Sequence, residues 1–172
     1  MNLFHEAGVV ILDFGSQYTQ LIARRIREQS VYSEILPANI RLSEIEERKP
    51  SAIILSGGPS SVFGDSSPKF DSTILDSDYP ILGICYGLQL LIHQSGGTVE
   101  STGSGEYGFA KLKVHNHDSL FKTIHDGTQV WMSHMDRVTH IPKEWTVLAE
   151  SENGVVASLA HENKKWVATQ FH

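Results

Sequence analysis

Short apolar runs alternate with helix-like segments through the first half of this 172-residue chain. Runs of strand length lie at residues 9–12, 32–36, 52–55 and 80–84. Most of these runs lack hydrophobic–polar alternation, which is typical of parallel strands covered on both faces. Helical spacing or capping patterns follow Ser16 and lie at 43–46, 68–77 and 86–92. The pattern predicts an α/β, flavodoxin-like fold: a mixed, mostly parallel sheet with helices on both faces.

The second half has a different texture from Gly96 onward. Short strand candidates lie at 99–100, 110–114, 129–132, 146–150, 155–159 and 166–170, separated by turn residues. They predict an additional β-rich C-terminal half that extends or wraps the first sheet. No linker or low-complexity stretch interrupts residues 1–172, so we expect a single domain.

The charge and composition of the chain argue against some classes of binding partner. Fourteen basic residues against twenty acidic ones give a formal charge of −6, and the basic groups at 24–27 and 164–165 are small. We therefore expect neither nucleic acid nor a membrane surface as partner. The longest uniform apolar runs are far shorter than the roughly 20 residues of a membrane span. One cysteine excludes an intrachain disulfide and is typical of a reducing compartment, which predicts a cytoplasmic protein.

The single cysteine, Cys85, stands in Gly83-Ile84-Cys85-Tyr86-Gly87, between a predicted strand and a predicted helix. Such a Gly-x-nucleophile-x-Gly junction holds its central side chain out above the sheet edge on a strained turn. A helix N-terminus also favours the reactive thiolate. The alternative is a buried cysteine that acts only as a small hydrophobe. The paired glycines favour the nucleophile.

A cysteine nucleophile requires an oxyanion site and a base. The backbone N–H of Tyr86 is one natural donor, and a glycine of Ser56-Gly57-Gly58-Pro59 is a second, although that segment is equally well a plain tight turn. His172 follows the apolar strand 166–171, at the sheet edge where α/β sites form, and is the candidate base. An ordinary surface histidine is the alternative there.

A metal site is not predicted. His115-x-His117 lacks further ligands at convincing spacing. The histidines without an assigned role are interpreted as surface or packing residues.

Three segments together resemble class I glutamine amidotransferases: 83–89, 56–59 and the terminal Gln170-Phe171-His172. The resemblance implies that Cys85 attacks the side-chain amide of L-glutamine and that His172 acts as base and acid. It assigns the oxyanion site to the backbone N–H groups of Gly58 and Tyr86. It assigns substrate binding to residues at five positions: Gln89, Ser133, His134, Met135 and Asp136.

Within the family, residues 12–18, 106–108 and 131–136 resemble the branch that supplies ammonia for conversion of xanthosine monophosphate (XMP) to GMP. That implies an ATP pyrophosphatase domain as partner, which uses ATP and Mg²⁺ and is absent from this chain. It implies no cofactor in the glutaminase domain itself, and a homodimer at full length.

Two departures from the family pattern concern the site. The family's Phe-His-Pro-Glu ending supplies a glutamate that orients the histidine, whereas this chain stops at His172. We therefore expect an N-terminal fragment, truncated within the domain, whose own activity is in question and whose uncovered apolar surface favours self-association. Met135 stands where the pattern usually has glycine, which puts the local backbone conformation in question.

Two alternatives remain at this stage. The first is an amidotransferase for another acceptor, as in CTP or anthranilate synthesis. The second is a catalytically silent binding or regulatory domain, or a cysteine-dependent stress protein of the same architecture.

Overall fold

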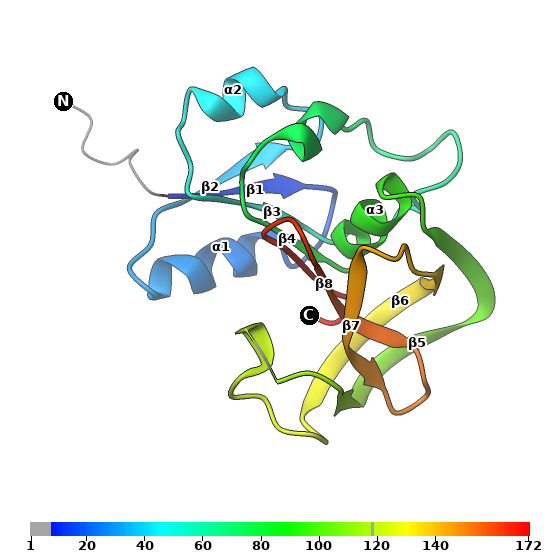
Figure 1. Cartoon of the computed structure of the whole chain (residues 1–172). Coiled ribbons are helices and arrows are strands. Elements are labelled where there is room, and N and C mark those ends of the chain that lie inside the picture. Colours follow the sequence, from blue (N-terminus) through cyan, green and yellow to red (C-terminus); the bar gives the residue numbers. More distant parts are fainter. Residues whose placement is uncertain (1–7, 118) are drawn as a thin grey trace.

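The computed structural model describes residues 8–117 and 119–172, and these form one nine-stranded sheet in the order β2-β1-β3-β4-β9-β8-β7-β5-β6 (Figure 1). The strands, in chain order, are β1 Val9–Asp13, β2 Ser33–Pro37, β3 Ala52–Leu55, β4 Ile81–Ile84, β5 Thr98–Val114, β6 Gln129–His140, β7 Trp145–Ser151, β8 Val156–His161 and β9 Trp166–Thr169. The protein therefore has the predicted α/β character, on a mixed sheet.

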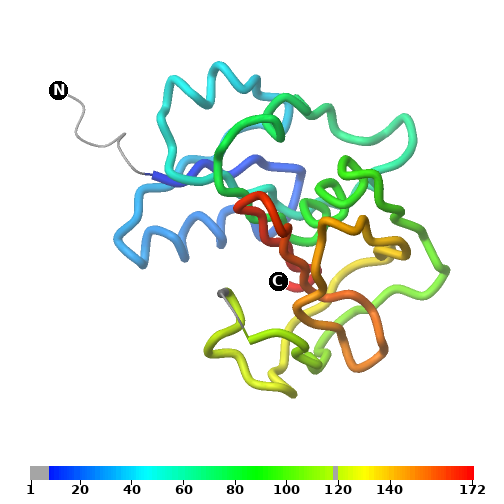
Figure 2. The backbone as a smooth tube through the Cα atoms, in the orientation of Figure 1, coloured from blue at the N-terminus to red at the C-terminus, as the bar shows by residue number. Residues whose placement is uncertain are grey.

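The prediction of a mostly parallel sheet is wrong. Strands β2, β1, β3, β4 and β9 pair in parallel, but β9, β8, β7, β5 and β6 pair antiparallel. Short connections from β7 to β8 and from β8 to β9 reverse the chain directly, as the path in Figure 2 shows, and such connections permit only antiparallel pairing.

The β-rich C-terminal half belongs to the same sheet and is not an addition apart from it. Of the two geometries expected for these strands, they extend the first sheet from its β4 edge and do not wrap against it. The last strand, β9, pairs directly with β4 and so brings the C-terminal residues to the middle of the molecule (Figure 1). A β5–β6 ribbon forms the far end of the sheet.

Helices are few and short: α1 Thr19–Glu28, α2 Leu42–Glu46 and α3 Tyr86–Gln94, with 3₁₀ turns at Ser72–Asp76 and Ser119–Phe121. The helix predicted over 68–77 is only the first of these 3₁₀ turns. Its start is fixed by the Asp71 carboxylate, which accepts hydrogen bonds from the backbone N–H groups of Thr73 and Leu42. No helix among the described residues combines the length and apolar character needed to cross a membrane.

The core separates into layers on the two faces of the sheet. Ile11 and Ile54 pack with Ala23 of α1 on one face. Leu12 and the α3 residue Leu91 belong to the cluster on the other face. Because α3 begins directly after β4, this packing fixes the β4–α3 junction at the carboxyl edge of the parallel strands, where sites form in such sheets.

Candidate active site

Cys85 occupies the junction between β4 and α3 with φ 54° and ψ −104°, a backbone conformation that residues with side chains rarely adopt. The flanking glycines make the junction sterically feasible. A Cβ built at Gly87 would lie 2.2 Å from the Leu55 carbonyl oxygen, and one at Gly83 would lie 2.6 Å from the Gly87 carbonyl oxygen. The strained elbow predicted from the spacing is therefore present.

The elbow opens into a pocket of about 590 Å³. Its lining includes Cys85, His172, Gly58, Gln89 and the segment 133–136, so one cavity gathers nearly all of the sequence-predicted site residues. The remaining lining residues are Gly15, Ser16, Gln17, Tyr18, Pro59, Ser60, Ser61, Ser101 and Tyr107.

Tyr86 is the predicted residue whose side chain does not line this pocket. Its ring is 1% exposed and packs against Phe14 with centroids 5.0 Å apart. Its backbone N–H hydrogen-bonds toward the Cys85 side chain and lowers the pKa of that thiol. The role expected for Tyr86 concerns only this backbone N–H.

Cys85 and His172 line the same pocket and both lie close to Gly57. A Cβ built at Gly57 would lie 3.4 Å from the Cys85 Cβ and 3.1 Å from the His172 Cε1. The imidazole also packs on the Tyr18 ring at 4.5 Å between centroids, and the His172 backbone N–H donates to the Trp131 carbonyl at 3.0 Å. The sheet order explains this proximity, because β4 and β9 are neighbours.

The prediction of a resting thiolate is wrong. Burial raises the pKa of Cys85 to about 11, and the hydrogen bonds from the Tyr86 N–H and from Gln170 offset this only in part. Desolvation thus outweighs the helix N-terminus. Burial lowers the pKa of His172, and the charge of His134 adds to that effect. At neutral pH the pocket therefore holds a thiol beside a neutral imidazole that can accept its proton.

Two buried glutamines connect the nucleophile to the far wall of the pocket. The Gln170 Nε2 donates to the Cys85 Sγ at 3.5 Å. The Gln89 Nε2 donates to the Gln170 Oε1 at 3.2 Å and to the Asp136 carbonyl at 2.9 Å. Gln170 is fully buried and had no predicted role of its own; its signal in the sequence is a polar residue that ends an apolar strand just before His172.

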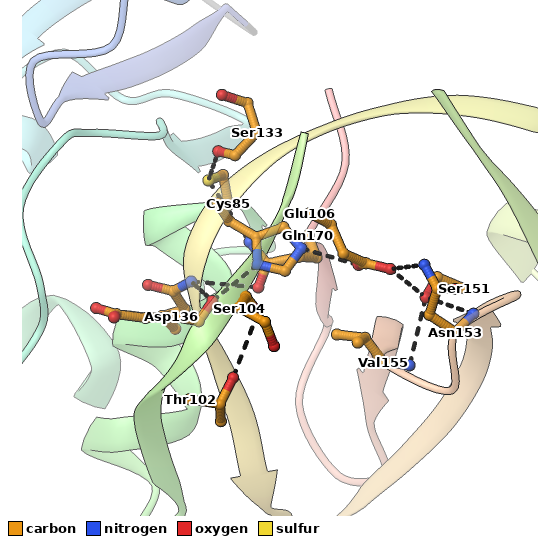
Figure 3. Close-up of polar contacts among 12 residues, drawn as sticks. Cys85, Thr102, Ser104, Glu106, Ser133, Asp136, Ser151, Asn153, Val155 and Gln170 are labelled. Atoms are coloured by element: carbon orange, nitrogen blue, oxygen red, sulfur yellow. Dashed lines mark hydrogen bonds and ion pairs between the residues drawn. The ribbon is translucent and has the colours of Figure 1, made fainter. Parts of the chain in front are cut away.

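The segment Ser133–Asp136 lies inside β6, which is longer than the predicted strand 129–132. The Cys85 thiol donates a hydrogen bond to the Ser133 carbonyl at 3.7 Å, and Figure 3 draws this contact. The Ser61 hydroxyl donates to the Asp136 carboxylate across the pocket. Met135 is not among the described residues with positive φ, so its backbone needs no glycine, and its side chain is 44% exposed at the pocket wall.

The Ser56–Pro59 segment is more than a plain turn. A Cβ built at Gly58 would lie 2.3 Å from the Phe14 carbonyl oxygen, so glycine is required for this close approach. The buried Ser56 Oγ accepts from the Phe14 N–H at 3.0 Å and donates to the Gly57 carbonyl at 2.9 Å. These contacts fix the glycine backbone beside Cys85.

Within the part of the chain that the structure describes, no group of three or more histidine, cysteine or acidic side chains is arranged to hold a metal ion. The side chains of His115 and His117, whose spacing suggests a metal pair, hydrogen-bond to protein groups instead. The His115 Nε2 lies 2.9 Å from a Glu150 carboxylate oxygen, and the His117 Nδ1 lies 3.1 Å from the Ile124 carbonyl.

A mixed α/β sheet with a cysteine elbow beside a histidine defines the class of proteins that use a cysteine nucleophile. The family model "Glutamine amidotransferase class-I" matches residues 10–172. The chain belongs to this family.

Curated relatives point to one branch of the family. The chain is 48% identical over 167 residues to "GMP synthase [glutamine-hydrolyzing]" of Campylobacter lari, and the match covers 97% of this chain but 33% of the relative. It is 44% identical over 180 residues to the protein of the same name from Legionella pneumophila strain Lens, where the match covers 100% of this chain and 34% of the relative. The chain thus spans about a third of the length of these relatives.

Solved structures agree with the fold. A GMP synthase component from Thermoplasma acidophilum superposes with a TM-score of 0.86 at 30% identity, covering 98% of this chain and 84% of that one. A glutamine amidotransferase from Thermotoga maritima superposes with a TM-score of 0.76 at 21% identity, covering 98% and 76% of the two chains. The second comparison concerns the fold alone.

Proposed function

We propose that this domain hydrolyses L-glutamine at Cys85 and supplies the ammonia that a GMP synthase uses to convert XMP to GMP. The observation that carries the proposal is that Cys85 and His172 line a single pocket and both lie close to Gly57. The relatives named GMP synthase support the choice of pathway.

In the proposed reaction, neutral His172 accepts the proton of the Cys85 thiol and the sulfur attacks the side-chain amide carbon of glutamine. The carbonyl oxygen becomes an oxyanion beside the backbone N–H groups of Gly58 and Tyr86. His172 returns the proton to the departing nitrogen, so ammonia leaves and a glutamyl thioester remains. Water, deprotonated by His172, then hydrolyses the thioester to glutamate and restores the thiol.

Substrate binding in this proposal falls to the residues of α3 and β6 that line the pocket. Gln89 and the segment 133–136 line the cavity beside Cys85. The Asp136 carboxylate offers an acceptor at this wall, and the β6 backbone offers further polar groups. Glutamine carries both an ammonium and a carboxylate at its α-carbon, so groups of both kinds are needed there.

The wider assignments rest on the relatives' length and names. We propose that the complete protein continues into an ATP pyrophosphatase domain that uses ATP and Mg²⁺, that the glutaminase domain itself needs no cofactor, and that the full-length protein is a homodimer. The relatives are about three times as long as this chain, which leaves room for such a domain. The cytoplasmic location stays a prediction from the sequence.

The decisive experiment is the intact mass of the complete protein after treatment with a glutamine-like chloroketone. We expect a single adduct on Cys85, protection by excess L-glutamine, and no adduct in Cys85→Ala. Labelling that glutamine does not prevent, or no labelling at all, would contradict the proposal. A silent regulatory domain predicts that outcome.

The acceptor is tested separately in the complete protein. Glutamine-dependent formation of GMP from XMP, ATP and Mg²⁺ is expected, and it should disappear in Cys85→Ala while free ammonia restores it. Glutamine hydrolysis without any amination of XMP would instead indicate another acceptor.

A further inference from the structure

A buried carboxylate–imidazole pair lies at the β6 wall of the pocket, where His134 is one of the lining residues. The Glu106 Oε2 is 3.0 Å from the His134 Nε2, and the two side chains are only 10% and 2% exposed. Glu106 has no role in the glutaminase reaction proposed above, and His134 enters it only as part of the segment 133–136 that lines the pocket. A buried pair of this kind is costly to desolvate, so its presence calls for a function.

The hydrogen-bond partners of His134, together with an ionised Glu106, indicate a doubly protonated imidazole. Its Nδ1 lies 2.9 Å from the Asp136 backbone carbonyl, which can only accept, and its Nε2 faces Glu106. A neutral imidazole has one N–H, whereas an imidazolium has two. Both contacts are satisfied when His134 is protonated and Glu106 is ionised.

Glu106 is held as an anion by groups on its far side (Figure 3). Its Oε1 accepts from the Ser151 hydroxyl at 2.7 Å and from the Asn153 amide at 2.9 Å. Burial works to raise the pKa of Glu106, but these hydrogen bonds, together with that from His134, outweigh it and leave the pKa lowered. The pair thus ties β5, β6 and the turn after β7 together.

The same stretch of β6 forms the pocket wall. Ser133, the residue before His134, places its carbonyl 3.7 Å from the Cys85 Sγ. The Asp136 carbonyl accepts from both His134 and Gln89. A displacement of His134 would therefore also shift the Ser133 carbonyl beside Cys85 and the Asp136 carbonyl that accepts from Gln89.

We propose that Glu106 and His134 are positioning residues, whose buried ion pair fixes the β6 wall at the distance that both the Cys85 thiol and the bound glutamine require. The proposal rests on the glutaminase function proposed above, and it adds residues that do not touch the reacting atoms. It also gives a reason for a buried charge pair, which by itself is weak evidence of stabilisation.

The test compares Glu106→Gln, which keeps the shape but removes the charge, with Glu100→Gln, an exposed glutamate on the same strand. Nitrogen chemical shifts of the His134 ring in the wild-type chain at pH 7 should show both nitrogens protonated. In Glu106→Gln one proton should be lost. Iodoacetamide should alkylate Cys85 about tenfold faster, because a loosened wall admits solvent and favours the thiolate.

The KM for glutamine should rise at least about tenfold in Glu106→Gln, with a smaller change in kcat, because a displaced wall weakens substrate positioning first. Glu100→Gln should match the wild type in all measurements. A neutral His134 in the wild type would overturn the proposal. So would a Glu106→Gln chain in which His134 loses its proton but alkylation and KM stay within about twofold of the wild type.

If Glu106→Gln fails to fold, Asn153→Ala takes its place, because it removes only one hydrogen bond to Glu106. The same rise in the alkylation rate of Cys85 and in the KM for glutamine is then expected. The proposed function fails separately, when the complete wild-type protein neither reacts with the glutamine-like chloroketone nor releases ammonia. In that case His134 protonation and the alkylation rate of Cys85 still decide whether the pair positions the wall.

Discussion

The amide of Gln170 lies 3.5 Å from the sulfur of Cys85 and donates a hydrogen bond to it. The Gln170 Oε1 accepts a hydrogen bond from the Gln89 amide nitrogen, which also donates to the Asp136 carbonyl. One chain of buried hydrogen bonds therefore connects Cys85, through Gln170 and Gln89, to the β6 wall at Asp136. Buried polar networks of this kind are stabilising only when every member is satisfied.

Removal of one member should therefore disturb both stability and reactivity. Gln170→Ala removes the Oε1 that accepts from Gln89 and the Nε2 that donates to the Cys85 sulfur. We expect a loss of about 1–3 kcal/mol in the free energy of unfolding. The pKa of Cys85 should rise further, because the Gln170 hydrogen bond lowers it. Chemical denaturation measures the change in stability, and the alkylation rate of Cys85 against pH measures the change in pKa. An unchanged pKa would show that the Gln170 hydrogen bond does not stabilise the thiolate.

Substitution of Gly57 should impair activity more than folding. A Cβ there meets the His172 ring at 3.1 Å and the Cys85 Cβ at 3.4 Å, so Gly57→Ala narrows the space between nucleophile and base. We expect kcat/KM for glutamine to fall by about 100-fold, since small displacements of reacting groups have effects of that order.

Gly87→Ala provides the contrast. Its Cβ would lie 2.2 Å from the Leu55 carbonyl oxygen, where the backbone must move, so the fold itself should lose about 1–3 kcal/mol or more. Thermal unfolding of both variants separates the effects. Equal loss of stability in the two would contradict the assignment of Gly57 to the reacting centre.

The alkylation rate of Cys85 should rise with pH and show an inflection near 11. The folded-state pKa is raised by burial, so the thiol stays protonated across the neutral range and only a small fraction is thiolate at pH 8. The same chain unfolded in denaturant should show an inflection nearer 9, the ordinary thiol value. An inflection below 8 in the folded chain would mean that a cation outweighs desolvation.

Glutamine hydrolysis should retain its activity to lower pH than an ordinary histidine base would allow. Burial and the charge of His134 lower the pKa of His172, so His172 stays neutral until the pH falls below 6.5. The acid limb of the kcat/KM profile should therefore lie below pH 6.5. In Glu106→Gln, where His134 is expected to lose its charge, this limb should move upward, whereas Glu100→Gln should leave it in place.

The local features of the site were predictable because they depend on neighbours in sequence. The glycines at 83 and 87 around Cys85 indicated a tight strand-to-helix turn, and the structure has it. The protonation state of Cys85 was not predictable, because it depends on burial by β6 and β9, which come from distant segments. The role of Gln170 likewise emerges only when β9 lies beside β4.

The same distinction holds for the sheet. The sequence by itself determined the parallel strands β1, β3 and β4, whose continuous apolar runs can only be buried on both faces. Tertiary structure decided that β9 pairs with β4 and that β6 folds over the carboxyl edge. These pairings depend on long-range backbone hydrogen bonds and on charges such as Glu106 and His134, which lie 28 residues apart. Hydrophobic spacing within a segment carries no information about such partners.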